Sequence, residues 1–85
     1  MSAQGYDSAK DKLVHDCGTV LEDDFNRLSA AIYQYGDKGK PKIQITREKF
    51  DNKQDKWIFA KLGRLNYEEF VAIAKAAKEG FDKVV

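Results

Sequence analysis

The sequence is poor in the residues that most often carry redox chemistry, metal binding and membrane insertion. Its 85 residues include one cysteine, one histidine, one methionine, one tryptophan and one proline. Because Cys17 has no second cysteine with which to form an internal disulfide, we expect a reducing setting, cytoplasmic or, in a eukaryote, nuclear. No stretch approaches the roughly 18–20 apolar residues of a membrane span, and residues 1–12 lack the apolar core of a secretory signal. We therefore expect no contact with a membrane.

His15 and Cys17, the only residues of their kinds, are the first candidates for catalysis. Two residues apart on a strand, they would point to the same face, where a thiolate–imidazole pair is conceivable. No motif supplies a third, orienting group, however, and two such ligands are too few for a zinc site. The preferred interpretation is a small buried thiol beside an ordinary histidine. We therefore expect no enzymatic activity, metal, cofactor or small-molecule substrate.

Charge is distributed unevenly along the chain, although the net charge is only +1. Residues 38–64 contain nine lysines and arginines against three acids, a net charge of +6, whereas residues 1–37 and 65–85 are net acidic. A basic segment of this kind is typical of a protein that binds a polyanion, usually nucleic acid. The alternative is a solvated, lysine-rich hairpin whose charge protects a sheet edge. Charge alone leaves both interpretations open.

The length and the hydropathy pattern predict a single α+β domain over residues 13–85, preceded by a flexible arm over residues 1–12. The clearest element is a C-terminal helix over residues 66–80, because Asn66 and Glu69 match a capping box. Apolar residues follow at the spacing of one helical face, and Gly80 offers a stop. That predicted buried face consists of Phe70, Ile73, Ala74, Ala77 and Phe81.

Residues 42–50 and 56–64 predict the two strands of a β-hairpin, because both are rich in β-branched and aromatic residues and the loop between them is polar. Pairing Phe50 opposite Trp57 keeps the aliphatic side chains together, where the C-terminal helix would cover them. This register also places Arg47 near Ala60 and Ile45 near Leu62, with Ile43 near Arg64. The aliphatic face would contain Ile43, Ile45, Ile58, Ala60 and Leu62. The opposite face would contain Lys42, Thr46, Glu48, Phe50, Trp57, Phe59 and Lys61.

Residues 13–35 are compatible with two structures. A short N-terminal strand fits KLVHDCG, and from Thr19 a second capping-box pattern precedes apolar residues at helical spacing, which favours a second helix over residues 20–35. In the competing interpretation, the segment SAAIYQY is a strand that pairs with residues 42–50 through the turn GDKGKP. The alanines and the helical period favour the helix, whereas the tyrosines favour the strand.

Aromatic residues alternate with cations on the predicted hairpin. Proteins that hold single-stranded nucleic acid combine positive charge along the backbone with aromatic faces on which bases stack, each worth about 1–3 kcal/mol. Phe50, Trp57 and Phe59 would form such a platform. In the alternative, these aromatic residues belong to a core covered by a helix or a second subunit. The candidate nucleic-acid-binding residues are Lys42, Arg47, Lys49, Phe50, Lys56, Trp57, Phe59, Lys61 and Arg64.

Residues 40–80 also carry a family pattern. The segments KIQITREKF and KWIFAKLGRLNYEEF contain an arginine followed by an aromatic, a basic strand end with a glycine, and a helix start with a leucine and a cap residue. They resemble the positive cofactor four family of single-stranded-DNA-binding transcriptional coactivators and its bacterial relatives. The resemblance implies a curved antiparallel sheet with a helix, a dimer formed through the helices, and DNA contacts by Arg47, Phe50 and Lys61. The positions that carry it are Arg47, Phe50, Lys61, Gly63, Leu65, Asn66, Glu68 or Glu69, and Phe70.

We therefore expect a homodimeric α+β protein that binds single-stranded nucleic acid, with DNA as the first candidate, and reads little of its sequence. The alternative is a protein-interaction module or small regulator that uses the same apolar sheet face for a partner. Alanine substitutions of the hairpin cations would separate the two functions. They would weaken nucleic-acid binding but leave an apolar protein interface intact.

Overall fold

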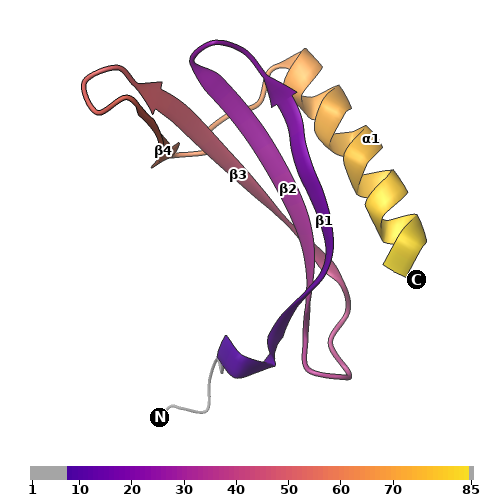
Figure 1. The fold of residues 1–85 in the computed structure, drawn as a ribbon. Coiled ribbons are helices and arrows are strands. Elements are labelled where there is room, and N and C mark those ends of the chain that lie inside the picture. Colours follow the sequence, from indigo (N-terminus) through magenta and orange to yellow (C-terminus); the bar gives the residue numbers. More distant parts are fainter. Residues whose placement is uncertain (1–7, 85) are drawn as a thin grey trace.

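Four strands and then one helix follow each other in the computed structural model, which describes residues 8–84 (Figure 1). A short 3-10 turn at Ser8–Lys10 leads into β1 (Asp11–Glu22), β2 (Asn26–Tyr35), β3 (Lys42–Asp51) and β4 (Lys56–Ala60). The helix α1 spans Tyr67–Val84. Of the predicted arm, residues 1–7 lie outside the described residues, and residues 8–12 form the turn and the start of β1.

Each strand pairs antiparallel with the next one in sequence, which gives one four-stranded sheet of order β1-β2-β3-β4. The helix α1 packs on one face of this sheet, mainly over β1 and β2 (Figure 1). The fold class is therefore α+β, with a single helix in the described residues. None of the described helices combines the length and the apolar character needed to cross a membrane.

The second helix predicted over residues 20–35 is wrong, because this segment contains the end of β1, a turn and β2. The segment also has a period of two, and the alternate residues of β2 form the buried centre of the sheet. Phe25, which supported the helical pattern, is 55% exposed. Because β1 and β3 supply hydrogen-bond partners on both sides, pairing overrides the helical propensity of the alanines. The buried residues of β2 are Leu28, Ala30 and Ile32.

The predicted register of the β3–β4 hairpin is confirmed where the two strands pair, over residues 47–51 and 56–60. The further pairs predicted from it, Ile45 with Leu62 and Ile43 with Arg64, are not formed. Phe50 lies opposite Trp57, and Arg47 lies opposite Ala60. The second strand is shorter than predicted, because β4 ends at Ala60 and the chain continues to α1 as a loop. Leu62 still packs against the core from this loop, although it has left the strand ladder.

The capping box predicted at the start of α1 is formed. The Glu69 N–H donates to Asn66 Oδ1 over 2.8 Å, and the Asn66 N–H donates to Glu69 Oε1 over 3.0 Å. The buried face of the helix, however, is rotated from the prediction, since Ile73 and Gly80 are buried while Phe70 and Ala74 are exposed. The packing of α1 on the sheet therefore leaves an apolar stripe of the helix exposed.

Gly80 does not stop the helix, which continues to Val84. It is instead a position at which the helix lies too close to the sheet for a side chain. A Cβ atom on Gly80 would lie 2.8 Å from Ile32 Cδ1 and 3.0 Å from Cys17 Sγ, closer than side-chain carbons normally come. The absence of a side chain thus lets α1 lie directly on β1 and β2.

Candidate nucleic-acid interface

The nine candidate residues divide between the two sides of the sheet. We call the sheet face opposite α1 the open face. Side chains alternate along a strand, and Arg47 reaches α1, so the residues next to it on β3 face away from the helix. Lys42, Phe50, Trp57 and Phe59 accordingly belong to the open face, as predicted from the register.

The remaining candidates lie on the helix side or at the end of the hairpin. Lys49 follows Arg47 with the same orientation, and Lys61 and Arg64 belong to the loop before α1. The expected position of Lys61 on the aromatic face is not realised, because β4 ends one residue before it. Lys56 is exposed at the start of β4, beside the hairpin turn.

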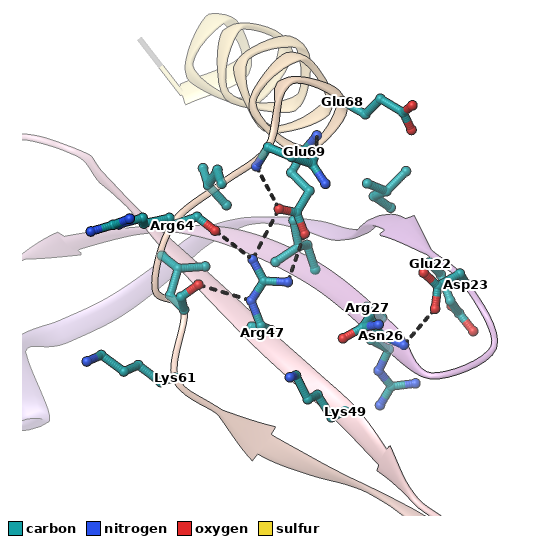
Figure 2. A pocket seen from close by; sticks show the side chains of 15 residues that line it. Glu22, Asp23, Asn26, Arg27, Arg47, Lys49, Lys61, Arg64, Glu68 and Glu69 are labelled. Atoms are coloured by element: carbon teal, nitrogen blue, oxygen red, sulfur yellow. Dashed lines mark hydrogen bonds and ion pairs between the residues drawn. The ribbon is translucent and has the colours of Figure 1, made fainter.

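These helix-side residues line a groove of about 770 Å³ between the start of α1, the loop before it and the ends of β2 and β3 (Figure 2). Cations lie on one side of the groove, and acids lie at the end of β1, in the β1–β2 turn and in the first turn of α1. The pKa of Asp23 is lowered by hydrogen bonds from the backbone N–H groups of Phe25 and Asn26, so this acid stays ionised. Apart from Arg27 and Arg47, which are paired with Glu48 and Glu69, the cations are Lys49, Lys61 and Arg64. The acids, apart from Glu69, are Glu22, Asp23 and Glu68.

Arg47 lies at the centre of the groove and is fully engaged with protein acceptors (Figure 2). Its Nη1 and Nη2 donate to the two carboxylate oxygens of Glu69 over 2.8 and 3.2 Å. Its Nε donates to the Leu62 carbonyl over 3.0 Å, and Nη2 also reaches the Arg64 carbonyl at 3.4 Å. The side chain is 10% exposed. Arg47 thus ties β3 to the loop and to α1, which is a structural role.

The ion pair also affects the titration of both partners. Hydrogen bonds from Arg47 and then from the Asn66 N–H lower the pKa of Glu69, while Glu69 raises the pKa of Arg47. Because the carboxylate accepts from both the cap and the guanidinium, the charged form is favoured in the folded state. The same carboxylate therefore caps α1 and anchors it to the sheet.

Arg27 is a neighbour of the aromatic platform that the sequence did not reveal. Its guanidinium lies 4.4 Å from the centre of the Trp57 ring, and its Nε donates to Glu48 Oε1 over 2.6 Å. Arg27 and Glu48 are directly opposite each other on β2 and β3. The cross-strand pair of opposite charges is the signal that could have found it, but only once residues 26–35 are known to be a strand.

Of the three aromatic candidates, Phe59 is the most open. It is 80% exposed, whereas Trp57 is half-buried with Arg27 against its ring. Phe50 packs edge-on to Trp57 with ring centres 5.5 Å apart. Trp57 and Phe50 therefore form a small aromatic cluster that supports the hairpin, and Phe59 presents a free ring face.

His15 and Cys17 belong to β1, and their side chains lie against Gly80 of α1. The Cys17 thiol donates to the Ala76 carbonyl at 3.8 Å. Burial, followed by the charge of Asp16, raises the pKa of Cys17, which favours the protonated thiol over the reactive thiolate. Within residues 8–84, no group of three or more His, Cys, Asp or Glu side chains is arranged to hold a metal ion.

Comparison with known proteins gives no relative for this chain: no family model, curated protein or solved structure matches it.

Proposed function

We propose that this protein binds single-stranded nucleic acid along the edge of the sheet formed by β4. The observation that carries the proposal is the exposure of charge beside an open aromatic ring. Eight of the nine cations in residues 38–64 are exposed. Of the two aromatic residues of β4, Phe59 is more exposed than Trp57. Arg47, the ninth cation, is neutralised by Glu69.

The two sides of β4 suit the two parts of a nucleotide. Phe59 on the open face can stack against a base, whereas Lys49, Lys61 and Arg64 on the helix side can contact phosphates. A single strand that passes over the short β4 edge would meet both sets at once. The acids of the groove limit phosphate contacts to its cationic side. These contacts would be to the phosphate backbone and to the faces of the bases. The arrangement therefore predicts that binding affinity depends only weakly on base sequence.

The resemblance of residues 40–80 to the positive cofactor four family supports the same function. The antiparallel sheet and the single helix of the described residues agree with the sheet and helix that the resemblance implies. Arg47 is the position at which our proposal departs from it, because we assign this residue to the sheet–helix junction. We retain DNA as the first candidate, since that family binds single-stranded DNA.

A salt titration tests the proposal. Binding of a labelled oligothymidylate would be followed by fluorescence anisotropy between about 50 and 200 mM salt. Three phosphate contacts give a slope of log affinity against log salt of about −2, since each contact contributes about −0.7 for a single strand. Lys61→Ala should make the slope less steep by one contact, and Lys75→Ala, on an exposed part of α1, should not. Absence of binding at low salt would reject the proposal in favour of a protein-interaction module.

We further propose that the protein is a homodimer through the exposed stripe of α1. Tyr67, Phe70, Val71 and Ala74 recur on one side of the helix and are all exposed, next to the stripe that Ile73 and Gly80 bury on the sheet. A stripe with this spacing fits an identical stripe on a second helix. Few side chains among residues 8–84 are buried, so a second copy would add apolar burial to this small core.

A further inference from the structure

The open face contains a hollow that the proposed function does not use. It arises because β2 carries two small residues, Ser29 and Ala31, at its centre, while Leu13 and Tyr33 are larger residues at one end. The cavity measures about 220 Å³. The hollow is lined by Leu13, Asp16, Ser29, Ala30, Ala31, Tyr33, Gln44 and Thr46.

The strand register places polar groups on three sides of the hollow. Asp16 on β1 and Gln44 on β3 both lie opposite Ala31, which forms the floor between them. The backbones of β1 and β3 are about 10 Å apart there, two strand spacings. Ser29 and Thr46 are opposite each other in the adjacent row and contribute two hydroxyl groups. The hollow thus offers a carboxylate, an amide and two hydroxyls around a small apolar floor.

A β-bulge orients the carboxylate. The register of β1 shifts between Asp16 and Gly18, and Gly18 has a φ of 72°, a conformation that glycine adopts without strain. The Gly18 N–H donates to Asp16 Oδ1 over 2.8 Å. A carboxylate can accept about four hydrogen bonds, so one internal bond positions Asp16 and leaves it able to accept others.

The size and charge of the hollow indicate which part of a nucleic acid fits. The volume of the hollow is below the range of about 300–1,000 Å³ that is typical of sites for larger ligands, so the hollow suits a single base. The Asp16 carboxylate repels a phosphate but accepts hydrogen bonds from the edge of a base. Lys42 lies opposite Tyr33 at the rim of the hollow and can contact the flanking phosphate. Phe59 belongs to the same face, so one strand can reach both places.

We propose, on the basis of the proposed function, that the hollow binds one base and selects guanine. Guanine presents two adjacent donors, N1–H and the N2 amino group, which a carboxylate accepts as a pair in the way that it accepts the two donors of an arginine. Adenine, cytosine and thymine each present a single donor group to Asp16 on this edge. Gln44 and the two hydroxyls supply donors for guanine O6 and N7. The protein is therefore selective for one nucleotide within an otherwise sequence-tolerant contact.

Competition binding tests the inference with oligothymidylates that contain one central guanine, hypoxanthine, adenine or cytosine. The guanine oligonucleotide should bind roughly tenfold more tightly than plain oligothymidylate, the discrimination expected of one paired contact to a base. Hypoxanthine, which keeps N1–H but lacks the N2 amino group, should be intermediate. Asp16→Asn should abolish the guanine preference, since asparagine can still accept from the Gly18 N–H but offers only one acceptor oxygen.

Asp24→Asn is the matched control, because Asp24 is an exposed acid of the β1–β2 turn and its replacement removes the same charge. Both variants should bind plain oligothymidylate slightly more tightly, because each removes one negative charge. Only Asp16→Asn should bind the guanine oligonucleotide no better than plain oligothymidylate, whereas Asp24→Asn should keep the preference. Ala31→Leu, which fills the floor of the hollow, should also remove the preference while keeping the salt dependence of binding. Circular dichroism would show that each variant folds.

The outcomes separate this inference from the proposed function. If no oligonucleotide binds at low salt, both are overturned. If the protein binds oligonucleotides but does not distinguish guanine from thymine, only the guanine site is overturned. A guanine preference that persists unchanged in Asp16→Asn would also overturn it, because the selection would then arise elsewhere.

Discussion

The guanidinium of Arg47 and the carboxylate of Glu69 face each other through two hydrogen bonds of 2.8 and 3.2 Å, at the junction of the sheet and the helix. Their side chains are only 10% and 12% exposed. A lysine cannot reproduce this planar, two-point contact, nor the additional bonds to the loop carbonyls. The pair is therefore the main polar connection between β3 and α1 in the described residues.

Replacing Arg47 by alanine should lower the free energy of unfolding by about 2–3 kcal/mol, because Glu69 and two carbonyls lose a charged donor. Urea denaturation followed by circular dichroism would measure this loss. Arg47→Lys should restore only part of it. Lys78→Ala, which breaks the exposed pair with Asp82, is the control and should cost about 0.5 kcal/mol or less. Full stability combined with lost nucleic-acid binding would instead make Arg47 a contact residue.

Stability should fall in acid because of Glu69. Hydrogen bonds from Arg47 and the Asn66 N–H lower the pKa of Glu69 in the folded state. The unfolded chain therefore binds the proton first, and the stabilisation is complete above the ordinary glutamate pKa of about 4.3. It is lost as the pH falls through the lower pKa of the folded state. Denaturation midpoints between neutral and acidic pH would show this loss, and Glu69→Gln should flatten the profile in that range.

Gly80→Ala should destabilise the protein, although alanine is the better helix former by about 1 kcal/mol. The added methyl would lie 2.8 Å from Ile32 Cδ1, in a close-packed contact, and such overpacking costs about 1–3 kcal/mol. Thermal denaturation would measure the change. Ile32→Val removes Cδ1 and so relieves the clash. The double variant Gly80→Ala/Ile32→Val should therefore lose less stability than the two single variants lose in total. Simple additivity would show that the clash is not with Ile32.

Phe59→Ala should weaken binding of oligothymidylate by about 1–3 kcal/mol, the value of one base–aromatic stack. Because Phe59 is 80% exposed, the melting temperature should stay close to that of the parent protein. Fluorescence anisotropy at a fixed salt concentration would report the loss. Phe59→Leu preserves apolar bulk but lacks the ring, and should bind as weakly as Phe59→Ala. Parent-like affinity of the leucine variant would argue against stacking.

Phe70→Glu should convert the proposed dimer into a monomer, because it places a charge at the centre of the exposed stripe of α1. Sedimentation equilibrium at several protein concentrations would measure the association. Phe25→Glu is a closely matched control, since Phe25 is 55% exposed and Phe70 is 60% exposed, and Phe25 lies in the β1–β2 turn. A parent protein that is monomeric at all accessible concentrations would exclude this interface.

Local patterns of the C-terminal half predicted the pairing at the start of its hairpin and the start of its helix. The Asn66–Glu69 capping box and the Phe50–Trp57 register depend on residues close in sequence, and both are present. The C-terminal end of the helix could not be predicted from local patterns. Gly80 resembles a stop signal in sequence, but its effect depends on Ile32 and Cys17, which come from distant strands.

The N-terminal half and the division of the candidate site could not be predicted from local patterns. Residues 26–35 carry both a helical and a strand period, and the choice depends on pairing with β1 and β3. Without β2, Arg27 could not be placed beside Trp57. Nor could the sequence show that Arg47 is neutralised, because Glu69 lies 22 residues away.

The strand order also has a consequence for folding. Every strand pairs with its neighbour in sequence, so each hairpin closes through a short turn at low entropic cost. The docking of α1 on β1 is different, because it joins Cys17 and Ala76, 59 residues apart. We therefore expect the hairpins to form early and the helix to dock last. Until that step, the strip formed by Leu28, Ala30 and Ile32 is uncovered, which makes the undocked sheet the species most prone to aggregate.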